Sequence, residues 1–150
     1  MKPRGAAVRG FFRWLLTLAY GFAGWAHLAR PGGFLAITPP WVPWPDFVVA
    51  STGVAEILGA IGLMIPQTRK AAGWGLALYA LCVWPANFHH ALANIPLGGA
   101  QLGWWYHGPR LALQPLIIWW ALWASGAVHW PFGGKEAPNI RSSRGGRDVG

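Results

Sequence analysis

Glu56 is the residue whose type and position point most directly to chemistry. It is the only ionisable residue between Phe47 and Ile65, a run that is otherwise apolar apart from Ser51 and Thr52. A carboxyl group at the centre of a membrane helix costs roughly 2.5–3.5 kcal/mol on insertion scales. We therefore predict that Glu56 is paired, protonated or hydrated, and that it has a functional role. A protonated carboxyl that makes only a structural hydrogen bond is the alternative.

Five further polar residues are expected to lie in one half of the bilayer. Glu56, near the midplane, is expected to be the most deeply placed residue of this group. They come from the other apolar segments or their ends, and they are His27, Asn87, His90, Arg110 and Gln114. Arg110 and Gln114 are one helical turn apart and so share a helix face. These six residues form the predicted ligand-binding cluster. For Asn87 and Gln114, the alternative is interhelical contact without a ligand, worth about 0.6 kcal/mol for each hydrogen bond.

The same residue types limit the reactions that the sequence offers. It contains no nucleophile–base pair, phosphate-binding loop or metal-ligand spacing, so we predict no catalytic residue and no metal ligand. Cys82 is the only cysteine, which excludes an intramolecular disulfide and a C-x-x-C redox pair. His27 and His90 are expected at similar depth on helices that can be diagonal in a bundle. A haem-binding redox carrier is therefore kept as a less favoured alternative.

The elements that must position this cluster are four long apolar segments, residues 10–29, 47–65, 71–93 and 111–130. Each is close to the 20 or so residues that a helix needs to cross a bilayer. Charged residues make up 11% of the chain, against about 25% in soluble domains. The predicted fold is an all-α membrane protein, with an up-down four-transmembrane-helix bundle over residues 1–132. A disordered basic tail is predicted over 133–150.

The basic residues predict how the bundle is oriented. The formal net charge is +8, yet all but two of the 12 Lys and Arg residues lie near the chain ends or in the 66–70 turn. The positive-inside bias produces this distribution, whereas a nucleic-acid surface does not require it. Both termini are therefore predicted to be cytoplasmic, and no nucleic-acid partner is expected. A cleaved signal peptide is the alternative for residues 10–29, but the aromatic content and the missing small-x-small site favour a retained helix.

Two outer connections are predicted to be irregular and to lie at the membrane interface. Residues 30–45 contain five prolines between aromatic residues, which is too proline-rich for a helix and too apolar for a free aqueous loop. Residues 94–109 have a similar composition. Inside the third and fourth segments, Pro85 and Pro115 each remove one backbone hydrogen bond beside Asn87 and Gln114.

Several short segments of the chain resemble the DoxX family of small bacterial membrane proteins. They are His27-x-x-x-Pro31 with the loop to Pro45, Val54-Ala55-Glu56-Ile57-Leu58-Gly59 with Pro66 and Arg69, Trp84-Pro85-Ala86-Asn87, and Arg110-Leu111-Ala112-Leu113-Gln114-Pro115 with Trp119-Trp120. The resemblance implies a four-helix membrane bundle in a bacterial inner membrane and an association with membrane redox complexes.

These observations predict a non-catalytic accessory or ligand-binding component of a membrane redox or stress-related system. A quinone or a lipid would suit a cleft with a polar floor and apolar walls. Besides the lipid bilayer, the expected partners are a membrane redox protein or a second copy of the chain. The alternative is a proton-coupled membrane enzyme or transporter that uses Glu56. The sequence specifies no cofactor.

Overall fold

The described part of the chain is built from helices. The computed structural model describes residues 3–96 and 98–130, so the predicted tail over 133–150 lies outside it. The helices are α1 (Pro3–Ala29), α2 (Gly32–Ile37), α3 (Pro45–Met64), α4 (Arg69–Leu92) and α5 (Gly103–Ser125). No β-strand occurs among the described residues, and the all-α prediction is confirmed for them.

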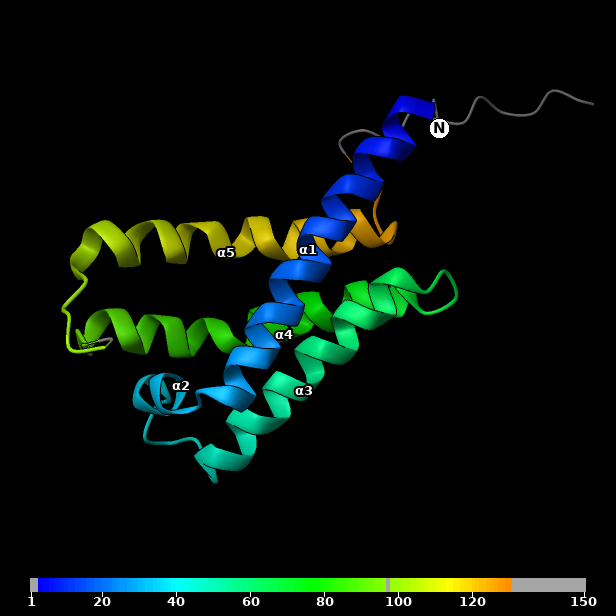
Figure 1. Cartoon of the computed structure of the whole chain (residues 1–150). Helices are drawn as coiled ribbons and strands as arrows, with labels where there is room; N and C mark the ends of the chain where they lie inside the picture. The colour runs from blue at the N-terminus through cyan, green and yellow to red at the C-terminus, as the bar shows by residue number, and fades with distance from the viewer. Residues whose placement is uncertain (1–2, 97, 131–150) are drawn as a thin grey trace, which may run out of the picture.

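The four long helices form two antiparallel pairs, α1 with α3 and α4 with α5 (Figure 1). The two pairs are inclined to one another, and a short turn joins α3 to α4. α1 packs against α3 and α5, and α4 packs against the same two helices. α1 and α4 are therefore the diagonal helices of the bundle. The short helix α2 packs against α3 and α4.

The close approach within each pair depends on glycine. A Cβ atom added at Gly24 of α1 would lie 2.6 Å from the carbonyl oxygen of Gly53 on α3. In the other pair, a Cβ added at Gly73 of α4 would overlap the side chain of Ser125 on α5. Small residues at a helix contact allow the two backbones to approach this closely.

α5 differs from the predicted fourth segment at both ends. It begins at Gly103 instead of 111 and ends at Ser125 instead of 130. The early start includes Pro109 within the helix, where the ring removes one hydrogen bond without ending the helix. The early end is set by Gly126, whose φ of 79° gives a left-handed cap, and its N–H donates to the carbonyls of Leu122 and Trp123.

The first connection also differs from the prediction, because it contains the helix α2. The expectation that residues 30–45 are too proline-rich for a helix was wrong for 32–37. Pro31 is the N-cap of α2 and Pro39 follows its C-cap, so the prolines flank the helix and none interrupts it. α1 begins at Pro3, seven residues before the predicted start, with proline in the first turn. α3 and α4 begin and end within two residues of the predictions.

Arginines fix one end of the bundle by binding the free carbonyls of helix C-termini. Nε of Arg13 donates to the carbonyl of Ala124 in the last turn of α5, at 2.9 Å. Nε of Arg69 donates to the carbonyl of Leu63 in the last turn of α3, at 3.0 Å. The guanidinium of Arg9 lies 5.3 Å from the ring centroid of Trp123. The last four carbonyls of a helix have no partner within that helix, so these contacts satisfy groups that would otherwise need water.

The apolar core lies toward the same end. It contains buried residues from all four long helices, namely Leu16, Tyr20, Ala60, Leu63, Leu76, Ala77, Ala121, Trp123 and Ala124. Toward the opposite end, the space between the helices is lined by polar and apolar side chains together. The core therefore holds the helix pairs at one end, and the other end contains a cavity.

One helix of the described chain, α3, is long and apolar enough to qualify as a candidate membrane span by length and composition. For the other three long helices, the sequence-based expectation of a membrane span stays a prediction.

Candidate functional site

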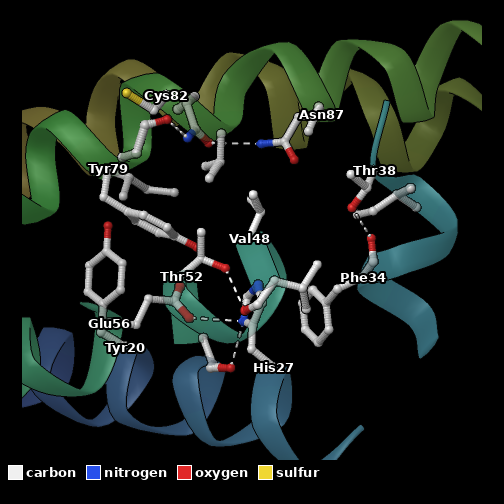
Figure 2. Close-up of a pocket in the computed structure, with 18 of the residues that line it drawn as sticks. Tyr20, His27, Phe34, Thr38, Val48, Thr52, Glu56, Tyr79, Cys82 and Asn87 are labelled. Atoms are coloured by element: carbon white, nitrogen blue, oxygen red, sulfur yellow. Dashed lines mark hydrogen bonds and ion pairs between the residues drawn. The ribbon is translucent and has the colours of Figure 1, made fainter. Parts of the chain in front are cut away.

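A cavity of about 590 Å³ lies between the helices and brings predicted site residues together (Figure 2). Five of the six predicted residues line it: His27, Glu56, Asn87, Arg110 and Gln114. Apolar side chains from the long helices form much of the remaining wall, among them Leu16, Val48, Val49, Val83 and Ile117. The volume falls within the range of roughly 300–1,000 Å³ that is typical of small-molecule sites.

His27 and Glu56 form an ion pair across the α1–α3 crossing. Nδ1 of His27 lies 3.0 Å from Oε2 of Glu56 and 2.9 Å from the carbonyl oxygen of Ala23. The Ala23 oxygen can only accept, so Nδ1 carries a proton and donates it there. Oε2 of Glu56 lies within ion-pair distance of the imidazole but has no hydrogen-bond partner among the described residues. Glu56 is 4% exposed, so this contact is shielded from bulk solvent.

Two tyrosines complete the surroundings of Glu56. The hydroxyl groups of Tyr79 on α4 and Tyr20 on α1 both lie close enough to Glu56 to interact with it electrostatically. The two phenol rings contact each other edge to face, with centroids 6.2 Å apart. Figure 2 shows both rings beside Glu56 on the side away from Phe34. A hydroxyl and an imidazole therefore lie close to one buried carboxyl group, and such a set can hold or exchange a proton.

Arg110 and His90 form the second polar centre. Nη1 of Arg110 donates to Nδ1 of His90 at 2.9 Å, and Nε2 of His90 donates to the carbonyl of Ile95 at 3.0 Å. These two bonds define the tautomer: Nε2 carries the proton and Nδ1 accepts, so His90 is neutral. The guanidinium also lies 5.9 Å from the ring centroid of Tyr106. His90 is 1% exposed and does not line the cavity itself, but it positions the arginine that does.

Asn87 and Gln114 link α4 to α5 along the cavity wall. Nε2 of Gln114 donates to the carbonyl of Ala80 at 2.5 Å, and Nδ2 of Asn87 donates to Oε1 of Gln114 at 3.4 Å. Both α4 and α5 continue through the nearby Pro85 and Pro115. Gln114 thus links the two helices through hydrogen bonds and also lines the cavity. In Figure 2 the carboxamide oxygen of Asn87 is directed away from this bond.

Comparison with known proteins now assigns a family. Residues 16–125 match a family described as a domain of unknown function, DUF8561. The chain belongs to the DUF8561 family. No curated protein and no solved structure matches the chain. These comparisons provide no link to the DoxX family, so that resemblance stays a prediction.

The DUF8561 range contains several residues of the site that the sequence reasoning missed. Tyr20 and Tyr79 were not singled out, because a tyrosine in an apolar run is usually a packing residue. The side chain of Phe34 on α2 stacks on the His27 ring with centroids 3.6 Å apart. The sequence did not indicate this stacking contact, because Phe34 lies in residues 30–45, which were expected to be irregular.

His107 is a further missed residue of the DUF8561 chain. It is 2% exposed, and its ring centroid lies 4.7 Å from that of His90. Neither ring nitrogen has a hydrogen-bond partner among the described residues. It was overlooked because residues 94–109 were predicted to form a loop, whereas α5 already includes His107.

Proposed function

We propose that this chain is a four-span membrane protein of the DoxX-like type whose cavity binds an amphipathic ligand, a quinone or a lipid. In this role it is a non-catalytic accessory component of a membrane redox or stress-related system, and the bilayer, a redox protein or a second copy are its partners. One observation carries the proposal: five of the six predicted polar site residues line one cavity of about 590 Å³, and the other walls of that cavity are largely apolar.

The outer surface supports placement in a membrane. Large apolar side chains are exposed along all four long helices, for example Phe11, Trp14, Leu18, Phe22, Leu58, Ile61, Leu78, Leu81, Leu113 and Leu116. Soluble monomers rarely expose contiguous apolar patches beyond a few hundred Å². A bilayer that covers these faces removes the cost of their exposure to water. α3 meets the length and composition required of a span, and the other long helices carry their polar residues largely toward the cavity or the helix ends.

The proposed orientation places the arginine-rich end in the cytoplasm and the cavity in the outer half of the bilayer. Arg9 and Arg69 both lie close enough to Arg13 to interact with it electrostatically. Such a cluster on one side is the feature that the positive-inside bias favours. Both termini would then be cytoplasmic in a bacterial inner membrane. Terminal fusions test this: a green fluorescent protein should fluoresce at either terminus, and alkaline phosphatase should be inactive at both.

Native mass spectrometry of the gently extracted full chain tests ligand binding. We expect a bound small molecule with the mass of a quinone or a lipid, and weaker retention in Glu56→Gln and Arg110→Ala. Unchanged retention in both variants would place the ligand outside the cavity and reject the proposed site. The same spectrum reports whether the protein is a monomer or a homo-oligomer.

A proton-coupled enzyme or transporter is the second candidate, and the surroundings of Glu56 favour it. Glu56, His27 and Tyr79 form a buried set of proton-exchanging groups in the cavity wall. Proton flux into liposomes that contain the purified protein, compared with the Glu56→Gln variant, distinguishes this activity from simple binding. Equal flux in both would exclude Glu56 as the proton site.

A haem-binding carrier is less well supported. Although α1 and α4 are diagonal, both ring nitrogens of His90 are already engaged, by Arg110 and by Ile95. Axial ligation by this residue would require one of these bonds to break. The visible spectrum of the purified protein tests it, since a haem protein shows a Soret band.

A further inference from the structure

Arg110 is a cation in the cavity wall without an anionic partner in the described chain. Residues 3–96 and 98–130 contain two carboxylates, Asp46 and Glu56. Glu56 is paired with His27, and Asp46 is exposed at the start of α3. The contacts of Arg110 are a neutral imidazole and an aromatic ring, which orient the guanidinium without neutralising it.

The geometry of α4 explains why Glu56 does not neutralise Arg110. Glu56 interacts with Tyr79, whereas Arg110 is bound to His90, eleven residues later on the same helix. At 1.5 Å per residue, these two positions are about 16 Å apart along the helix axis. The cavity therefore has an acidic centre at one level and a basic centre at another, each with its own set of partners.

Arg110 also keeps hydrogen-bonding capacity for a ligand. A guanidinium has five N–H donors in a planar fork, and within the described chain one nitrogen, Nη1, makes a hydrogen bond. The fork geometry matches the paired oxygens of a carboxylate or a phosphate. Because His90 holds Nη1 from a buried position, the arginine is oriented before any ligand arrives.

We propose that the cavity binds an amphipath with an anionic headgroup, a carboxylate or a phosphate, through Arg110. The apolar chain of the ligand lies along the walls that Val83 and Ile117 help to form. This inference rests on the proposed function, because it names the class of ligand for the same cavity. A neutral quinone would leave the charge of Arg110 uncompensated at the cavity wall, whereas a monoanion compensates it.

The test measures how tightly charged and neutral single-chain probes bind the purified full chain in neutral detergent. The probes are oleate, oleoyl lysophosphatidate, mono-oleoylglycerol and decylubiquinone, each titrated and followed by native mass spectrometry. Oleate and lysophosphatidate distinguish a carboxylate from a phosphate source, and mono-oleoylglycerol is the neutral control with the same chain. We expect at least one anionic probe to bind roughly tenfold or more tightly than mono-oleoylglycerol, as one charge-assisted hydrogen bond would give.

Variants test whether the preference for anionic over neutral probes depends on Arg110. Arg110→Gln should bind charged and neutral probes equally, and Arg110→Lys should keep most of the preference because it keeps the charge. Arg30→Gln is the matched control, since Arg30 is exposed and does not line the cavity; it should behave as the wild type. If Arg110→Gln does not fold, the wild-type preference and the Arg110→Lys variant still decide the question.

The possible failures are distinguishable. Equal binding of anionic and neutral probes by the wild type would overturn this inference and leave the proposed function intact. Loss of the preference in Arg30→Gln as well would also overturn it. If none of the four probes binds, both the inference and the proposed ligand-binding function are rejected.

Discussion

Nδ1 of His27 lies 3.0 Å from Oε2 of Glu56, and this ion pair depends on two glycines. Gly24 and Gly53 each precede one of the two residues by three positions, on α1 and α3 respectively. A Cβ at Gly24 would lie 2.6 Å from the Gly53 carbonyl oxygen, and a Cβ at Gly53 would lie 2.7 Å from the Cβ of His27. The contact of the two side chains therefore requires that the two helices cross without intervening methyl groups.

The first prediction is that Gly24→Ala and Gly53→Ala both destabilise the protein. Each added methyl group meets backbone atoms, so the helices must separate, at a cost of about 1–3 kcal/mol in the free energy of unfolding. Gly21→Ala on the same helix is the control, because no heavy atom lies within 4 Å of its added Cβ. Alanine there should stabilise α1 by about 0.5–1 kcal/mol. Reversible unfolding of the three variants in detergent, followed by circular dichroism, measures the difference.

A second prediction concerns the energy that couples His27 to Glu56. In each single variant, Glu56→Gln or His27→Gln, one of the two original side chains stays buried beside a neutral glutamine. The double variant removes both charges. We expect the double variant to be more stable than the sum of the two single effects predicts, by about 1–3 kcal/mol. A double-mutant cycle on the unfolding free energy gives this value directly. Additive effects within about 0.5 kcal/mol would mean that the 3.0 Å contact contributes no coupling.

The sequence was sufficient to predict that these polar residues gather at one site. A polar group buried in an apolar chain costs free energy, so such groups tend to lie together. Glu56 stands alone in an apolar segment, and His27, Asn87, Arg110 and Gln114 were expected at similar depths. The structure brings all five to one cavity. Helix order and alternating direction followed from segment length and short connections, which are local properties of the sequence.

Other features of the site depend on contacts that the sequence does not encode locally. Phe34 reaches His27 because α2 folds back from a proline-rich connection, and those prolines flank the helix. Tyr79 lies near Glu56 because α4 packs against α3 with the helix face that carries Tyr79. His107 was missed because Pro109 suggested a loop, although a helix tolerates a proline whose lost hydrogen bond is compensated by packing.

The third prediction separates the two buried histidines of the second polar centre. His90→Phe removes the acceptor for Arg110 and the donor to Ile95. Leaving these groups without partners should cost about 1–3 kcal/mol. His107→Phe removes no hydrogen bond within the described chain and keeps an aromatic ring of similar size, so its effect should stay within about 1 kcal/mol. Unfolding midpoints of the two variants in the same detergent provide the comparison, and equal losses would contradict the bonding assigned to His90.

The last prediction uses two adjacent basic residues to separate helix capping from membrane orientation. Arg69 donates from Nε to the Leu63 carbonyl at 3.0 Å and from Nη2 to the Met64 carbonyl at 3.4 Å, whereas Lys70 is exposed. Arg69→Ala should therefore lower the unfolding free energy by about 1 kcal/mol more than Lys70→Ala does. Each variant removes one positive charge from the same turn, so the proposed membrane orientation should respond equally to both. Terminal reporter fusions should report the proposed cytoplasmic ends in both variants, because the other basic residues remain. Equal stabilities would show that the arginine contributes only charge, and a reversed orientation in Arg69→Ala alone would show that capping of α3 also determines how the bundle inserts.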